Sequence, residues 1–150
     1  MKNIPKFQSL AAGLALALSL ATGGALAADA PQARDVARQK VVFQVSVDEP
    51  KSWNLVLNNA RNVQQELGAN NVDVEIVVYG PGIGMLKFDS VVANRIDEAV
   101  GNGIAVVACE NTMKAQKLAK ADMLASAGFV PAGVVELMKK QKEGYAYIRP

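Results

Sequence analysis

The sequence predicts an α/β domain in which helices cover both faces of a mostly parallel sheet of about five strands. Two observations predict this three-layer, doubly wound architecture. Segments rich in β-branched residues alternate along the chain with segments whose apolar residues recur every three or four positions, as on one face of a helix. Connections of helix length between consecutive strands also favour parallel pairing through right-handed crossovers.

The predicted elements follow one another in a regular order. Glycines at positions 68, 101 and 144 stand where helices are expected to end. In chain order, the prediction is a strand over 41–47, a helix over 51–67, a strand over 74–79, a glycine loop over 80–84, a helix ending near 101, a strand over 104–108, a helix after Cys109, a turn around 122–127, a helix over 132–143 and a strand over 145–148.

The helix periodicity also predicts which side chains are buried. Asp89 is expected to cap the second helix. The strand over 104–108 is apolar on both alternating faces, which is typical of a central strand covered by helices. The helix side chains expected in the core are Trp53, Val56, Leu57, Ala60, Val63 and Leu67 in the first helix, Val92, Ile96 and Ala99 in the second, and Val134, Val135, Leu137 and Met138 in the last.

The first 27 residues have the pattern of a secretory signal peptide. Lys2 and Lys6 precede an apolar run over 10–20, and small residues follow up to Ala27, after which we expect cleavage. The apolar run is about half the ~20 residues that span a bilayer, so no stable membrane anchor is expected. We therefore expect a periplasmic or secreted protein, with a loosely held arm over 28–39 and one α/β domain over 40–150.

Composition excludes several kinds of chemistry. The chain has 150 residues, 16 of them basic and 14 acidic, and loss of Lys2 and Lys6 with the leader leaves 14 of each. This balance gives no electrostatic reason to expect nucleic acid as a partner. Because there is no His and only one Cys, imidazole base chemistry, His-ligated metals and a thiolate zinc site within one chain are excluded. We expect no metal and no cofactor.

Cys109 is the strongest candidate for a functional residue. It follows a predicted strand, where ligands of open α/β sheets gather, and it precedes a helix N-terminus, which favours a thiolate. Glu110 opposes this effect with its negative charge, and the alternative is a buried Cys that acts as a small hydrophobe. The candidates for stabilising a thiolate or persulfide are Asn111, Thr112, Met113 and Lys114.

Gly80, Gly82 and Gly84 form a loop at the end of the second predicted strand. This loop could border the same cleft as Cys109. Its spacing differs from the dinucleotide-binding G-x-G-x-x-G pattern, and Pro81 has no N–H to offer a phosphate. Two interpretations stay open: a turn that needs small residues, or a loop that contacts a ligand.

Four motifs, taken in order, resemble the DsrE/DsrF-like family. They are Tyr-Gly-Pro-Gly-Ile at 79–83, Val-Ala-Cys-Glu-Asn-Thr-Met at 107–113, Pro-Ala-Gly-Val-Val-Glu-Leu at 131–137 and Glu-Gly-Tyr-Ala-Tyr-Ile-Arg-Pro at 143–150. The resemblance covers residues 41–150. It implies a three-layer α/β fold, usually assembled as a homo- or hetero-oligomer, and a persulfide on a Cys in the position of Cys109. Glu110 departs from the Gly expected after that Cys.

The leading hypothesis is therefore an exported sulfur carrier or sulfurtransferase that forms a persulfide on Cys109. Its partners would be a sulfur donor and an acceptor thiol, and we expect a homo-oligomer. A thiolate carrier needs no His, so the composition permits this chemistry. The alternative is a noncatalytic module with the same fold, which binds a small ligand or serves as an oligomeric structural subunit.

Overall fold

Five parallel strands form one sheet in the order β4-β3-β2-β1-β5. The computed structural model describes residues 38–150. The strands are β1 (Gln39–Val45), β2 (Val72–Val78), β3 (Ala105–Cys109), β4 (Gly128–Val130) and β5 (Ala146–Ile148); the α-helices are α1 (Pro50–Leu67), α2 (Ala93–Gly101), α3 (Glu110–Ala115) and α4 (Gly133–Lys142). Three 3₁₀ helices connect them: η1 (Ala69–Asn71), η2 (Gly80–Leu86) and η3 (Lys120–Asp122). The predicted α/β class and five-stranded sheet are confirmed, and every strand pair is parallel.

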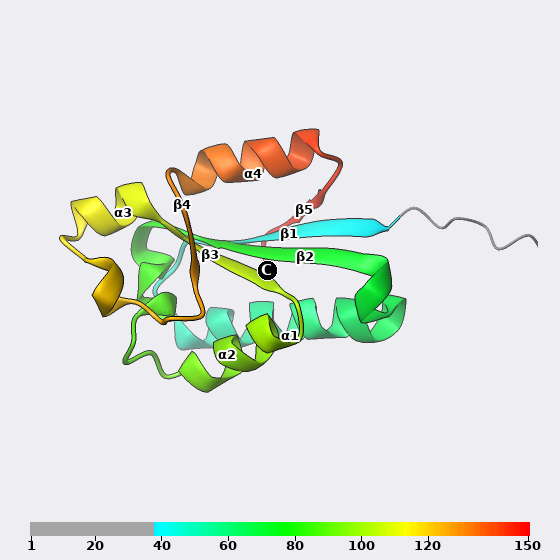
Figure 1. Cartoon of the computed structure of the whole chain (residues 1–150), viewed down its shortest axis with the longest axis horizontal. Helices are drawn as coiled ribbons and strands as arrows, with labels where there is room; N and C mark the ends of the chain where they lie inside the picture. The colour runs from blue at the N-terminus through cyan, green and yellow to red at the C-terminus, as the bar shows by residue number, and fades with distance from the viewer. Residues whose placement is uncertain (1–37) are drawn as a thin grey trace, which may run out of the picture. The chain divides into compact units, whose positions relative to one another are not determined.

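Helices cover the two faces of the sheet (Figure 1). Helices α1 and α2 lie on one face, and α4 lies on the other. Side chains alternate accordingly along β1, where Phe43 and Val45 belong to the larger core under α1 and α2, and Val42 packs with Leu137 of α4. Both sheet faces are therefore apolar, as parallel sheets require.

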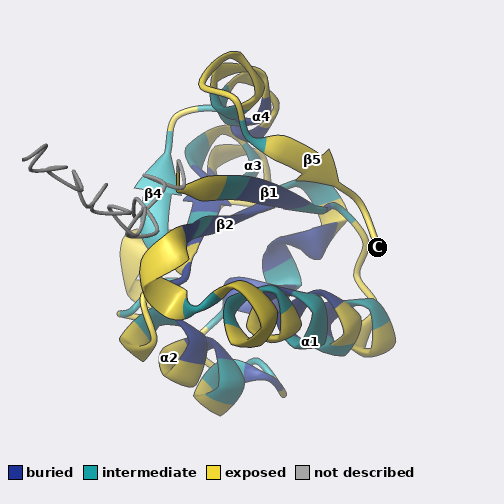
Figure 2. Cartoon of the chain, turned by 90° about the vertical axis from the view of Figure 1, so that its right-hand side faces the viewer, coloured by how far each residue is buried: buried dark blue, intermediate teal, exposed yellow. Residues whose placement is uncertain are grey.

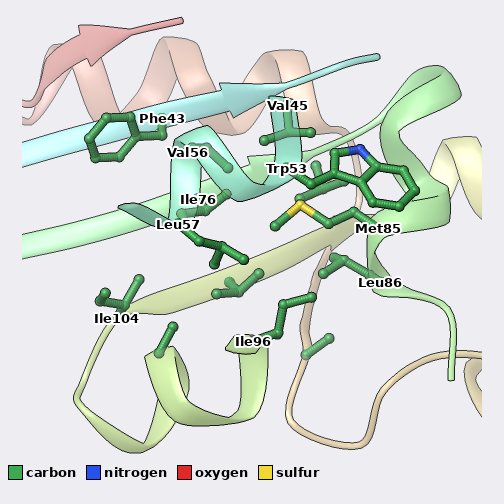
Figure 3. Packing of buried hydrophobic residues seen from close by; sticks show 14 of the residues in the cluster. Phe43, Val45, Trp53, Val56, Leu57, Ile76, Met85, Leu86, Ile96 and Ile104 are labelled. Carbon is green, nitrogen blue, oxygen red and sulfur yellow. The ribbon is translucent and has the colours of Figure 1, made fainter. Parts of the chain in front are cut away.

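The larger core lies between the sheet, α1, α2 and η2 (Figure 3). The prediction for α1 is confirmed at four positions, because Trp53, Val56, Leu57 and Ala60 are all buried. The glycine segment forms η2, and its apolar side chains are fully buried. Those side chains are Ile83, Met85 and Leu86.

Four of the predicted core positions are wrong. Leu67 is 43% exposed, and on α4 Val134, Val135 and Met138 are 53%, 61% and 54% exposed. Helix α4 rests on the sheet through its buried residues Gly133 and Leu137, and Lys140 Nζ lies 2.7 Å from Glu75 Oε2 of β2, so the other sides of the helix face outward (Figure 2). An apolar stripe on a helix can face solvent or a partner as well as a core, and helical spacing alone does not separate these cases.

Three further findings concern the predicted elements. The sequence pattern does not predict β4, because this edge strand has only three residues and is too short to show periodicity. Strand β3 lies inside the sheet between β2 and β4, so the predicted central position of the strand over 104–108 is confirmed. Helix α2 begins at Ala93 after Val92, so Asp89 does not cap it.

The predicted leader and nearly all of the predicted arm lie outside the described residues. Strand β1 begins at Gln39, so the last residue of that arm pairs with Val72 in the sheet. Within residues 38–150, no helix combines the length and apolarity needed to cross a bilayer.

Candidate thiolate site

Cys109 is the last residue of β3 and directly precedes α3, at the carboxyl end of the parallel sheet. Its thiol is free of disulfide bonding, and the residue is only 5% exposed. Residues 77, 79 and 107 face α4, so Cys109 faces the same side as Tyr79 on the neighbouring strand. The placement at the strand end confirms where the sequence put this residue in the fold.

Four donors favour the thiolate of Cys109. Burial raises the pKa of the Cys109 thiol, but hydrogen bonds from the Thr112 hydroxyl and from the N–H groups of Gly133, Thr112 and Asn111 outweigh it, so the pKa lies below its ordinary value. Cys109 makes no regular side-chain capping bond to the first turn of α3. These donors bind the charged thiolate more strongly than the neutral thiol, so they favour ionisation of Cys109.

Gly80 orients the Thr112 hydroxyl. The Gly80 N–H donates to Thr112 Oγ1 at 2.9 Å, and this leaves the hydroxyl proton of Thr112 available for the Cys109 sulfur. Gln116 Nε2 donates to the Gly80 carbonyl at 3.3 Å, which ties α3 to the same residue. Gly80 has a φ of +54°, a left-handed conformation that favours glycine.

Gly133 allows the start of α4 to approach the sulfur. A Cβ at this position would lie 3.0 Å from Tyr79 Cβ and 3.3 Å from Cys109 Cβ, so a larger residue would push the backbone away. The Asn111 N–H also donates to the Pro131 carbonyl at 3.1 Å, which holds this segment against α3. Sequence reasoning missed Gly133 as a site residue, although it lies within the Pro-Ala-Gly motif at 131–133.

The structure brings together only part of the predicted site. Asn111, Thr112 and Gly80 lie at Cys109, as described above. Met113 is buried in the larger core, 4% exposed, and so fills space there. Lys114 lines a separate pocket of about 200 Å³ with Glu110, Met113, Leu118 and Lys120.

Gly82 and Gly84 allow η2 to pack closely against neighbouring segments. A Cβ on Gly82 would meet the Val45 carbonyl oxygen at 3.0 Å, and one on Gly84 would meet Asp48 Oδ1 at 2.9 Å. These two glycines therefore let η2 approach β1 and the start of α1 closely. Of the two interpretations of the loop, small residues required by packing fit Gly82 and Gly84, whereas Gly80 reaches the Cys109 site through Thr112.

Glu110 has a partner that the sequence did not reveal. Its carboxylate lies 3.0 Å from Lys120 Nζ, in a pair that is largely open to solvent. Lys120 Nζ also lies 4.5 Å from the centre of the Phe129 ring. Lys120 therefore faces the negative charge of Glu110, which opposes ionisation of Cys109.

A series of hydrogen-bonded polar side chains crosses the sheet beside Cys109, from Tyr147 of β5 to Tyr79 at the end of β2. Tyr147 donates its hydroxyl hydrogen to Gln44 Oε1, Gln44 Nε2 donates to Ser46 Oγ at 3.0 Å, and Ser46 hydrogen-bonds to Tyr79. Burial and the neighbouring Tyr147 raise the pKa of Tyr79 above its ordinary value, against the lowering effects of Arg149 and the Ser46 hydrogen bond. Tyr79 is therefore a neutral phenol beside the thiolate site.

Comparison with known proteins identifies the family of this chain. Residues 39–150 match the model of the DsrE/DsrF-like family. The chain belongs to the DsrE/DsrF-like family. Within the part of the chain that the structure describes, no three Cys, Asp or Glu side chains are grouped so that they could hold a metal ion.

Two solved structures resemble this DsrE/DsrF-like chain. A protein of unknown function from Methanobacterium thermoautotrophicum is 34% identical, with a TM-score of 0.72 over 75% of this chain and 99% of that one. A conserved protein of unknown function from Bacteroides thetaiotaomicron is 17% identical, with a TM-score of 0.63 over 77% of this chain and 98% of that one, and it shows likeness of fold alone. No match was found among curated proteins.

Proposed function

We propose that this DsrE/DsrF-like protein is an exported sulfur carrier or sulfurtransferase that holds sulfane sulfur as a persulfide on Cys109. The observation that carries the proposal is a buried sulfur surrounded by the Thr112 hydroxyl and by backbone N–H groups of α3 and Gly133, which lower its pKa despite burial. A structural thiol has no need of such donors, whereas a nucleophilic thiolate does.

The transfer exchanges one S–S bond for another. The Cys109 thiolate attacks the outer sulfur of a donor persulfide R–S–SH, a new S–S bond forms, and the thiolate R–S⁻ leaves as the old S–S bond breaks. An acceptor thiolate then attacks the outer sulfur of Cys109–S–SH and releases the Cys109 thiolate. Neither step requires an external oxidant or reductant, and the donors at Asn111, Thr112 and Gly133 stabilise the anion before and after each transfer.

Intact mass spectrometry tests this function. After exposure to inorganic polysulfide and removal of the excess, the wild-type protein should gain the mass of sulfur, and the gain should vanish on reduction. Cys109→Ser is the matched control and should gain nothing. An unchanged wild-type mass would contradict the proposal.

The low exposure of Cys109 favours a second candidate, a noncatalytic module that binds a small ligand. A thiol that is 5% exposed could simply line a cleft. Alkylation by iodoacetamide separates the two functions. A structural thiol should react only after denaturation. A thiolate carrier should react in the folded state, with a pH midpoint of alkylation below the ordinary thiol pKa of ~8.5.

Self-association and export complete the proposal. The exposed apolar side chains of α4, Val134, Val135 and Met138, offer a surface that a second copy could cover. Light scattering should give a mass above that of one chain at micromolar concentration, and a single-chain mass would contradict association.

N-terminal sequencing of exported material should begin at Ala28, and material beginning at Met1 would contradict cleavage.

A further inference from the structure

A pocket of about 140 Å³ lies at the carboxyl end of β1, beside the Cys109 site. Its volume equals that of roughly five water molecules in the liquid. Its polar lining comes from Gln44 and Ser46 of the β1 end, from Glu49 and Ser52 at the start of α1, and from Arg149. The mechanism proposed above does not use this pocket.

Ser46 links the pocket to the thiolate site. It lines the pocket and hydrogen-bonds to Tyr79, whose ionisation responds to both Cys109 and Arg149. The Tyr79 N–H donates to the Val45 carbonyl at 3.0 Å, so the parallel register continues past the strand ends. Neighbouring strands are about 4.8 Å apart and β1 lies two strands from β3, so the pocket is separated from Cys109 by at least about 10 Å.

The side chains that line the pocket include one cation, Arg149, and one anion, Glu49. Among residues 38–150, no carboxylate lies within ion-pair distance of Arg149. Glu49 accepts a hydrogen bond from Ser52 Oγ at 3.0 Å and keeps its second carboxylate oxygen for another donor. A simple anion would meet repulsion from Glu49 as well as attraction from Arg149. An α-amino acid group, with its carboxylate toward Arg149 and its ammonium toward Glu49, matches both charges.

We propose that this pocket binds the terminal α-amino acid group of a small peptide thiol whose persulfide is the sulfur donor to Cys109. The proposal rests on the sulfur-carrier function and specifies its substrate class. A γ-glutamyl thiol has the required shape, because its amino acid group and its sulfur lie at opposite ends of an extended chain. A separation of at least about 10 Å is too long for a free amino acid persulfide to reach both sites.

Two donors that differ only in the amino acid group test this inference. One is glutathione persulfide, and the other is the persulfide of N-butyrylcysteinylglycine, which lacks the α-amino and α-carboxylate groups but keeps the rest of the chain. The rate at which Cys109 gains sulfur is followed by intact mass at sub-saturating donor. The wild-type protein should react about tenfold faster with glutathione persulfide, because a charge-assisted hydrogen bond is worth about this factor.

Arg149→Gln should reduce the ratio of the two rates to near one, and Glu49→Gln should lower it in part. Arg61→Gln is the matched control, because Arg61 lies on α1 at a different pocket, and it should keep the tenfold ratio. Equal rates in the wild type, or a preference that survives Arg149→Gln, would overturn the pocket assignment. If polysulfide still loads Cys109 in that case, the carrier function stands; if no donor loads Cys109, both proposals fail.

Discussion

The Gly80 N–H and the Thr112 hydroxyl oxygen are joined by a hydrogen bond of 2.9 Å across 32 residues of sequence. This bond couples η2 to the first turn of α3. It also fixes which way the Thr112 hydroxyl proton points, and thereby helps to set the ionisation of Cys109. The pair explains how a glycine segment without phosphate-binding spacing takes part in a thiol site.

Thr112→Val should raise the pKa of Cys109 by about one pH unit. Valine keeps the shape of the side chain but removes the hydroxyl donor, and hydrogen bonds to charged groups are worth about 1.5–3 kcal/mol. The measurement is the pH midpoint of iodoacetamide alkylation in the folded protein. Thr112→Ser keeps the hydroxyl and should stay near the wild type. An unchanged midpoint in Thr112→Val would show that the hydroxyl does not act on the sulfur.

Gly133→Ala should both destabilise the fold and raise the pKa of Cys109. The added Cβ would be 3.0 Å from Tyr79 Cβ, so the start of α4 must move outward and carry its N–H away from the sulfur. Overpacking of this kind costs about 1–3 kcal/mol. Urea unfolding and the alkylation midpoint measure the two effects. Gly101→Ala is the control, because nothing lies within 4 Å of its added Cβ, and it should not lower stability.

The sequence predicted the fold well because strand and helix periodicities are local signals. It predicted the site only in part. Cys109, Asn111 and Thr112 are consecutive or nearly so, and their roles follow from one strand-to-helix junction. Gly133 is 24 residues further along the chain and reaches the sulfur only because α4 starts above β3. Similarly, no local pattern pairs Glu110 with Lys120, since the loop between them decides that contact.

The apolar side chains of α4 show a second limit of the sequence. Val134 and Val135 have the hydrophobicity of core residues, but only one sheet face is available to the helix, and Leu137 and Lys140 occupy it. Which apolar stripe faces the sheet depends on the tertiary packing. Helical spacing therefore located α4 and its buried Leu137 correctly, but it wrongly assigned Val134, Val135 and Met138 to the core.

Removing Glu110 and removing Lys120 should shift the pKa of Cys109 in opposite directions. Lys120 Nζ lies 3.0 Å from the Glu110 carboxylate, so the two charges partly offset each other at the sulfur. Glu110→Gln leaves Lys120 unopposed and should lower the pKa of Cys109, whereas Lys120→Met leaves Glu110 unopposed and should raise it. The alkylation midpoints of both variants at low salt test these directions, and the double variant should lie between the two single variants. A shift of the same sign in both single variants would contradict this account.

Removing one partner of the Glu75–Lys140 pair should strongly destabilise the fold, whereas replacing both partners by apolar residues should not. Lys140 Nζ lies 2.7 Å from Glu75 Oε2, the Glu75 side chain is 7% exposed, and within the described chain Glu75 Oε1 has no hydrogen-bond partner. Removing one partner of a buried pair typically costs about 3–5 kcal/mol, whereas an apolar replacement of both is often neutral or stabilising. Lys140→Met should therefore be strongly destabilised in urea, and Glu75→Leu with Lys140→Met should recover most of the loss. A double variant no better than the single one would contradict this account.

The lowered pKa of Cys109 also predicts how stability depends on pH. An acid whose pKa is lower in the folded than in the unfolded state binds fewer protons when folded, so unfolding becomes harder as pH rises between the two values. The contribution is fully present above the unfolded pKa of ~8.5 and is lost as pH falls through the folded pKa, at about 1.4 kcal/mol for each unit between them. The free energy of unfolding of the wild type minus that of Cys109→Ser, measured in urea under reducing conditions from pH 6 to 9, should therefore increase with pH and then level off. Thr112→Val, compared with Thr112→Val plus Cys109→Ser, should show a smaller increase, because one donor to the thiolate is gone. A difference that is flat or falls with pH would mean that Cys109 keeps its proton in the folded protein, and it would favour the noncatalytic module over the carrier.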